Sequence, residues 1–147
     1  MKRFSLIVTM LLAGWGQSWS ADLAPMLLAA AADGNSHMVQ QLLAQGGDAN
    51  AKNGAGRPAL VLAAFNGNER TVRALLAAGA DTNAVDGAGA SAVMEASAFG
   101  HAEVVRMLIQ AGADLNLKNK AGAGALQRAE KGKHKEVLKL LSDAGAS

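Results

Sequence analysis

The residue types that most often carry chemistry are sparse in this 147-residue chain. It has no cysteine, which excludes thiol catalysis, thiolate metal sites and disulfides. Its three histidines, His37, His101 and His134, have no second ligand at a spacing that would place both on one helix face. Serine and aspartate occur, but without the arrangement that activates a nucleophilic hydroxyl. The sequence therefore predicts a protein that is not an enzyme and that holds no metal or cofactor.

Two glycine-rich segments have the composition of a phosphate-binding loop. They are Gly54-Ala55-Gly56 and Gly87-Ala88-Gly89. Both lack a third glycine and the Lys-Ser/Thr pair that such a loop needs to hold phosphate and its metal ion. Their separation is also the one at which other motifs of the chain recur, which favours a repeated architectural loop over a phosphate site.

The first twenty residues have the organisation of a cleavable signal peptide. A basic start precedes a mainly apolar run at 4–13, and Ser18 and Ser20 are small residues at the positions that signal peptidase reads. The apolar run is about half of the roughly 20 residues that a membrane-spanning helix needs, which disfavours the alternative of an uncleaved anchor. We therefore expect a signal peptide at 1–20, a mature domain at 21–147, and export to a bacterial periplasm.

Charge is balanced over the expected mature chain but unevenly distributed along it. Removing the two basic residues of the signal segment from the 14 in the sequence leaves 12, against 12 acidic residues. A neutral chain gives no general electrostatic case for binding nucleic acid. From Lys118 onward, seven basic residues stand against three acidic ones, a local net charge of +4. This region is either a solvated polar end of the domain or a basic docking patch.

The chain from residue 21 onward repeats at one constant interval, which is the step from Gly46 to Gly79 and from Gly79 to Gly112. Each of these glycines begins a Gly-Gly/Ala-Asp-x-Asn motif, and alanines, leucine pairs and a turn glycine recur with the same period. The period divides the domain into units at about 21–52, 53–85, 86–118 and 119–147. Units this short cannot bury an apolar face alone, so they are expected to stack into a solenoid with one continuous core.

Each unit has the pattern of two short helices. In the second unit, Pro58 can open the first helix because the first turn tolerates a missing N–H. Gly67 permits the turn that follows. The second helix is expected near residues 69–78, where apolar residues share one face at helical spacing. Gly79 then suits a left-handed helix end.

These motifs resemble the ankyrin repeat, whose unit runs Asp-x-x-Gly-x-Thr-Pro-Leu-His-x-Ala-Ala-x-x-Gly-His-x-x-Val-Val-x-x-Leu-Leu-x-x-Gly-Ala-Asp-x-Asn. The third unit matches this pattern best, through Asp86, Gly89, Ser91, Ala96, Gly100, His101, Val104, Val105, Leu108, Gly112, Ala113, Asp114 and Asn116. The resemblance covers about residues 21–147. It implies an all-α solenoid of about four helix-turn-helix units joined by short hairpin loops.

The sequence also departs from the family pattern. The Thr-Pro-Leu-His tetrad is missing from every unit, so the hydrogen bonds of its Thr and His are expected to be lost or replaced. In the last unit, Lys133 stands where the turn glycine is expected. His101 and His134 fall on the family's turn histidine, which implies a structural role for both.

The resemblance implies a binding surface on the concave face, formed by the hairpin tips and the exposed sides of the first helices. We hypothesise that Phe65 and Phe99, on adjacent units, anchor a partner there, because interface hot spots favour aromatic residues. The alternative is that both rings fold into the core. Glu95 is also expected to pair with Arg128 of the next unit. The remaining candidate contacts are Asp33, Arg57, Asn66, Glu95, Lys120 and Lys131.

The function implied is non-catalytic protein–protein interaction in the periplasm, by a monomer without a stable membrane anchor after signal cleavage. Resemblance to small exported bacterial ankyrin proteins suggests support of a periplasmic enzyme, such as an antioxidant enzyme of the catalase type. One alternative is an immunity protein that neutralises a toxin targeted to the periplasm. Another is a binder of anionic surfaces through the basic last unit.

Overall fold

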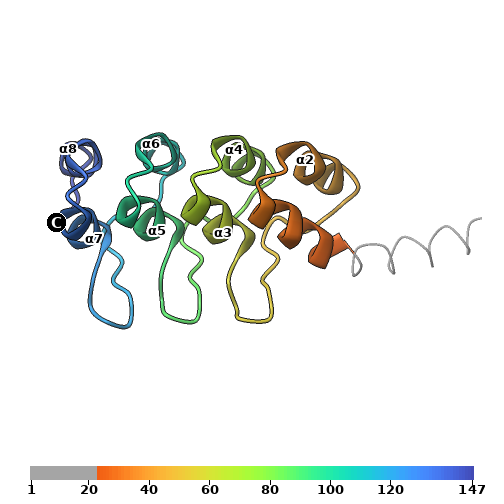
Figure 1. The fold of residues 1–147 in the computed structure, drawn as a ribbon, viewed down its shortest axis with the longest axis horizontal. Coiled ribbons are helices and arrows are strands. Elements are labelled where there is room, and N and C mark those ends of the chain that lie inside the picture. The colour runs from red at the N-terminus through yellow and green to blue at the C-terminus, as the bar shows by residue number, and fades with distance from the viewer. Residues whose placement is uncertain (1–22) are drawn as a thin grey trace, which may run out of the picture.

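The computed structural model describes residues 23–147, which form a row of helix pairs (Figure 1). The expected signal peptide at 1–20 lies outside the described residues. The helices are a first helix at 23–33 and then α2 (Ser36–Ala44), α3 (Ala59–Asn66), α4 (Glu69–Ala77), α5 (Ala92–Ala98), α6 (Ala102–Gln110), α7 (Ala125–Gly132) and α8 (Lys135–Asp143). Eight helices and no strand in this part of the chain confirm the expected all-α solenoid.

The helices form two layers. The first helix, α3, α5 and α7 make an inner layer, and α2, α4, α6 and α8 make an outer layer (Figure 1). A loop projects from the inner layer between successive pairs, away from the outer helices (Figure 1). None of the helices in residues 23–147 is long and apolar enough to cross a membrane.

The two layers bury their residues differently. α3 packs between neighbouring units as well as against α4, so Leu60 and Ala63 are buried together with most of that helix. α4 buries one stripe that includes Val72 and Leu75, whereas Arg73 between them is exposed. Each fully buried leucine contributes about 2–3 kcal/mol relative to an exposed one. Alanines between the helices let the units approach closely, because their side chains are small and the protein interior is close-packed.

Left-handed residues end the helices at regular intervals. Gly46, Gly79 and Gly112 follow the outer helices with φ angles of 95°, 87° and 82°, which confirms that they occupy equivalent places along the stack. The turn within each pair is also left-handed, with φ of 71° at Gly67. Lys133 makes this turn in the last unit with φ of 59°, and it is the only residue other than glycine with a positive φ in residues 23–147.

The Gly-x-Asp-x-Asn motifs join successive units through one recurring hydrogen bond. The asparagine side-chain oxygen accepts from a backbone N–H of the next unit in the pairs Asn50–Asp81 (2.7 Å), Asn83–Asp114 (2.7 Å) and Asn116–Ser147 (2.9 Å). Within each motif the aspartate carboxylate accepts from the asparagine N–H two residues later. The repeated motif is therefore a joint between units.

The turn histidines form a second set of joints. Nε2 of His101 lies 3.0 Å from the carbonyl oxygen of Phe65, and Nε2 of His134 lies 2.9 Å from that of Ala98. Each Nε2–H can donate to a carbonyl of the preceding unit. A Cβ added at Gly67 would come within 2.5 Å of the His101 ring. The structural role that the resemblance implied for both histidines is confirmed.

Other residues replace the missing tetrad. Ser91 precedes α5, and its Oγ accepts from the N–H of Met94 at 3.4 Å. At the start of α7, Oε1 of Gln127 accepts from the N–H of Gly124 at 2.7 Å. Pro58 precedes α3 without a side-chain cap, as its chemistry requires. The hydrogen bonds of the family tetrad are thus replaced in the third and last units.

Candidate functional site

Phe65 and Phe99 lie side by side at the surface, between the inner helices and the projecting loops. Phe65 is near the end of α3, and Phe99 directly follows α5. Their ring centroids are 4.7 Å apart with an interplanar angle of 68°, the edge-to-face geometry that aromatic rings favour. They remain 37% and 49% exposed, respectively, so neither ring belongs to the core. We call these two residues the aromatic pair.

Arg57 of the preceding loop extends the aromatic pair with a positive charge. Its guanidinium carbon lies 5.7 Å from the centroid of the Phe65 ring. Its Nη2 is also 3.5 Å from Oδ2 of Asp86, whose side chain is almost fully buried. A cation over an aromatic face gains about 0.5–1 kcal/mol at an exposed site. The ion pair with Asp86 thus helps to hold Arg57 over the ring.

The backbone beneath the aromatic pair is fixed by bonds between units. The His101 ring that donates to the Phe65 carbonyl also stacks on Phe99, with centroids 6.4 Å apart. Nδ2 of Asn66 donates to the carbonyl of Ala32 in the first unit at 2.9 Å. Because these contacts join three units, the backbone that carries the two rings is held in place from both sides.

The expected pair between Glu95 and Arg128 is confirmed, with Oε1 and Nη2 3.0 Å apart. Its setting differs from the expectation, however. The Glu95 side chain is only 7% exposed, because α5 is packed between α3 and α7. Glu95 is therefore committed to Arg128 and offers little surface to a partner. We leave it out of the candidate contact surface.

Two hollows flank the aromatic pair along the groove between the inner helices and the loops. One, of about 380 Å³, is lined by Asn53, Ala55, Arg57, Asp86, Gly87 and Ala88. The other, of about 420 Å³, is lined by residues that include Ala98, Asn119, Ala121, Arg128, Lys131 and Gly132. Both are shallow, and in each the alanine and loop surface that makes up most of the lining carries a few charged and amide side chains.

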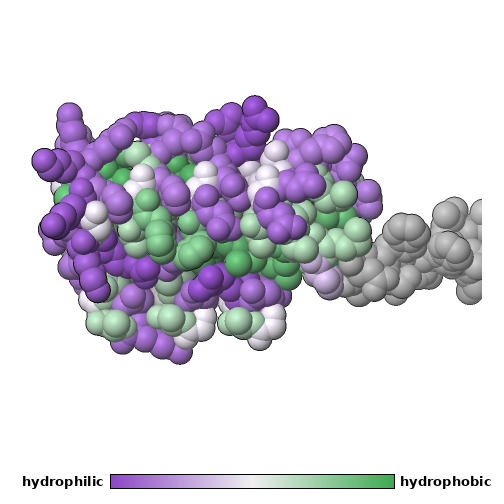
Figure 2. Space-filling model, viewed as in Figure 1, coloured by the Kyte–Doolittle hydropathy of each residue, from purple (hydrophilic) through white to green (hydrophobic). Residues whose placement is uncertain are grey.

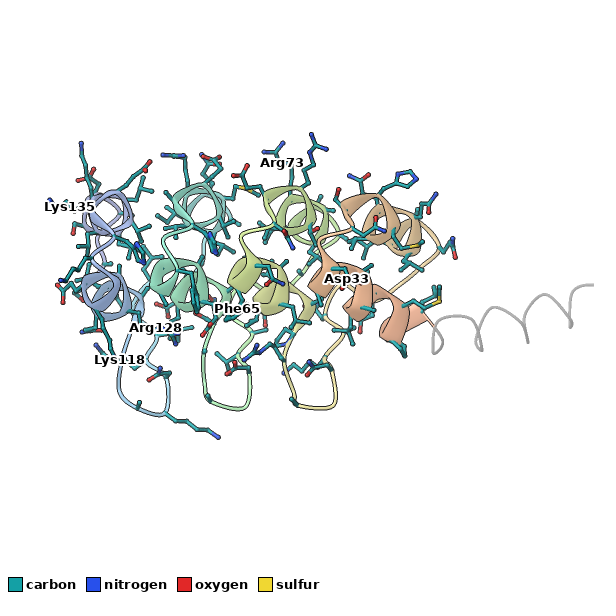
Figure 3. The ribbon with its side chains drawn as sticks, in the orientation of Figure 1. Asp33, Phe65, Arg73, Lys118, Arg128 and Lys135 are labelled. Atoms are coloured by element: carbon teal, nitrogen blue, oxygen red, sulfur yellow. The ribbon has the colours of Figure 1, made fainter. Side chains whose placement is uncertain are left out.

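The other candidate residues lie along the same row. Asp33 is exposed at the end of the first helix, Lys120 is exposed on the last loop, and Lys131 is exposed on α7. Figure 3 shows Asp33, Phe65 and Arg128 following one another along the inner helices. In Figure 2, a hydrophobic band crosses the middle of this face, and hydrophilic atoms cover the last unit. The groove therefore changes from apolar to charged along its length.

Sequence reasoning missed Asp86 as the partner of Arg57. The corresponding positions in the neighbouring loops are Asn53 and Asn119, which like Asp86 accept two backbone N–H groups of their own loop. The available signal was that only the middle loop has an acid at this position. From the sequence alone, Asp86 looks like an ordinary polar loop residue, because its bonds within the loop are not visible there.

The site has the chemistry of binding. It offers aromatic faces, guanidinium and ammonium groups, and hydrogen-bonding amides. Among residues 23–147, no group of three or more His, Asp or Glu side chains is placed to hold a metal ion. The described groove thus presents two exposed aromatic rings beside basic and amide side chains.

Comparison with known families gives one match. The family model for ankyrin repeats in three copies matches residues 26–119 and again residues 86–147. A search of curated proteins found no significant match. The two matches together span most of the chain and coincide with the stacked helix pairs, their left-handed turns and the joints between them. The chain therefore belongs to the ankyrin-repeat family.

Proposed function

We propose that this protein is an exported, non-catalytic binding module that holds another protein in its concave groove, with the aromatic pair as the anchor. Ankyrin repeats are in general protein–protein interaction modules. The observation that supports this particular site is the use of aromatic residues. Residues 23–147 contain no Trp or Tyr and just two Phe, and both are exposed in contact with each other.

Leaving both rings at the surface has a physical cost that a partner would remove. Covering the exposed part of a phenylalanine transfers apolar area out of water, at about 25 cal/mol per Å². Aromatic residues with polar surroundings dominate the energetics of many interfaces. The charged and amide groups of Arg57 and Asn66 provide such surroundings. A partner that inserts an apolar side chain against the two rings gains from both effects.

The proposed compartment is the periplasm, and the proposed client is an enzyme that works there. The support for export is the pattern of residues 1–20, together with a cysteine-free chain that tolerates oxidising conditions. An antioxidant enzyme is the client class that we would examine first. Cell fractionation of the tagged full-length chain tests the compartment, since a cytoplasmic location of the uncleaved chain would contradict export.

The binding site is tested by replacing both rings. The Phe65→Ala/Phe99→Ala double variant should lose the partner that the wild-type mature protein retains from a periplasmic extract, as identified by mass spectrometry. Its melting temperature should fall only slightly, because both rings are already partly exposed. A matched control is Met38→Ala, which removes an exposed apolar side chain from α2 in the outer layer. Retention of the same partner by the double variant would overturn the proposed site.

A further inference from the structure

We infer that the groove selects a partner segment in which an acidic side chain neighbours an apolar one. The apolar residue contacts the aromatic pair, and the carboxylate enters the hollow beside Arg128 and Lys131. This inference rests on the proposed function and specifies the chemistry of its partner.

The hollow exists because small residues replace the rings at equivalent positions. Ala98 stands one period after Phe65, and Gly132 stands one period after Phe99. Both Ala98 and Gly132 line the hollow of about 420 Å³. The aromatic pair therefore fills one stretch of the groove, and the stretch one period later is open. Because Ala98 and Phe99 are consecutive, the apolar anchor and the open recess adjoin each other.

The side chains that line this recess are basic or neutral. Arg128 and Lys131 come from α7, and Asn119 comes from the last loop. Among the ion pairs formed by residues 23–147, the one that involves this lining joins Arg128 to Glu95, so these two charges offset each other. Lys131 takes part in none of the ion pairs formed among residues 23–147. The recess thus keeps an unbalanced positive charge from Lys131.

Nearby charges do not reverse this balance. Lys120 is exposed on the last loop between Asn119 and Ala121, which both line the recess. Glu130 is one residue from Lys131, but it occupies the position of the buried residues Ala64 and Ser97, which the next unit covers. Its side chain accordingly belongs to the end of the stack, where it is exposed.

The other hollow is electrostatically different. Arg57 is the basic residue among those that line it, and it is paired with Asp86, which lines the same hollow. A partner carboxylate would meet an unfavourable Asp86 there, whereas at Lys131 it would meet a free ammonium. Charge complementarity therefore places the acidic residue of the partner toward the last unit. A lysine or arginine at that place would be repelled, which makes the groove selective for charge.

The test is selection of peptides from an unbiased displayed library on the immobilised mature protein. Wild type should enrich peptides in which Asp or Glu lies within a few residues of an aromatic or aliphatic residue. Lys131→Glu should remove that acidic bias and favour Lys or Arg at the same place. The matched control is Lys135→Glu, which makes the same charge change in the same unit but on α8 of the outer layer (Figure 3). It should leave the acidic bias intact.

Affinity measurements on one selected peptide sharpen the result. Lys131→Glu should weaken binding of the acidic peptide about tenfold, and replacing its acid by Gln should remove most of this difference, because a rim ion pair contributes through charge alone. Unchanged peptide preference in Lys131→Glu would overturn the inference. So would equal weakening by Lys131→Glu and Lys135→Glu, or binding of phosphatidylglycerol vesicles in place of peptides, since both indicate a diffuse basic surface.

The outcome is separable from that of the proposed function. If the Phe65→Ala/Phe99→Ala variant still selects the same peptides as wild type, the anchor itself is wrong. If the double variant loses peptides but Lys131→Glu selects as wild type does, the anchor stands and the carboxylate recess is rejected.

Discussion

The third and last units make the same turn between their helices with different residues. Gly100 makes it with φ of 73° and Lys133 with φ of 59°. A Cβ at Gly100 would come within 2.5 Å of the His134 ring of the following unit, whereas Lys133 is exposed. The interior turn is thus restricted by its backbone angle and by its neighbour. The last turn is restricted by its backbone angle alone, so a lysine is tolerated there.

The same contrast extends to the inner helices. Ser97 is buried in the third unit, while Glu130 at the equivalent position of the last unit is exposed. At interior positions, the residue type is limited by steric fit to a neighbouring unit. At the equivalent exposed positions of the last described unit, it is limited by contact with water. Charged residues consequently gather on the last unit without disturbing the repeat.

The largest expected effect is at the interior turn. Gly100→Ala should lower the free energy of unfolding by roughly 3 kcal/mol, because the left-handed backbone strain adds to displacement of the His134 ring. Gly112→Ala is the matched control, since its added Cβ meets nothing within 4 Å and only the strain of about 1–2 kcal/mol remains. Urea denaturation compares them, and equal losses would show that the neighbouring ring is not limiting.

Two ion pairs extend the comparison to buried and exposed charges. Arg128→Met leaves the buried Glu95 carboxylate without its partner and should cost roughly 2 kcal/mol of stability. Arg106→Met removes contacts with Glu103 and Glu136, whose side chains are 42% and 71% exposed, and should cost about 0–1 kcal/mol. Thermal unfolding in low and high salt provides the measurement. A loss at Arg128 no larger than that at Arg106 would contradict the role assigned to burial.

Lys133→Gly should stabilise the protein by about 0.5–1 kcal/mol. The glycine adopts the left-handed angle without a Cβ penalty, and this gain exceeds its additional entropy in the unfolded chain. Lys135→Gly serves as a control, because it places glycine in the first turn of α8, where helical geometry disfavours it. Chemical denaturation should therefore move the two midpoints in opposite directions.

The smallest effect concerns a hydroxyl that lacks a partner. Oγ1 of Thr71 is buried without a hydrogen bond, and the positions one and two periods later are the buried valines Val104 and Val137. Thr71→Val should raise the free energy of unfolding by about 0.5 kcal/mol, since it removes a desolvated polar group. Calorimetry on the two proteins would detect it, and a decrease would indicate that the hydroxyl is satisfied in solution.

The sequence allowed the periodic features to be predicted because period and register are linked. The equivalence of Gly46, Gly79 and Gly112 and the pairing of Glu95 with Arg128 both follow from adding one period to a residue number. The burial of Glu95 and the pairing of Arg57 with Asp86 do not. These depend on how far adjacent helices and loops approach, which spacing along the chain does not specify. The recess beside Lys131 was missed for the same reason, since it arises because Ala98 and Gly132 have no large side chain to fill it.

The bonds from Asn50, Asn83 and Asn116 have a consequence for how such a molecule can change in length. Each contributes an acceptor to the unit that follows, and each unit supplies a donor to the one before. A duplicated block of one full period would therefore carry both the donor for the preceding unit and the acceptor for the following unit. The number of units can therefore change in whole periods with this bond preserved at every joint.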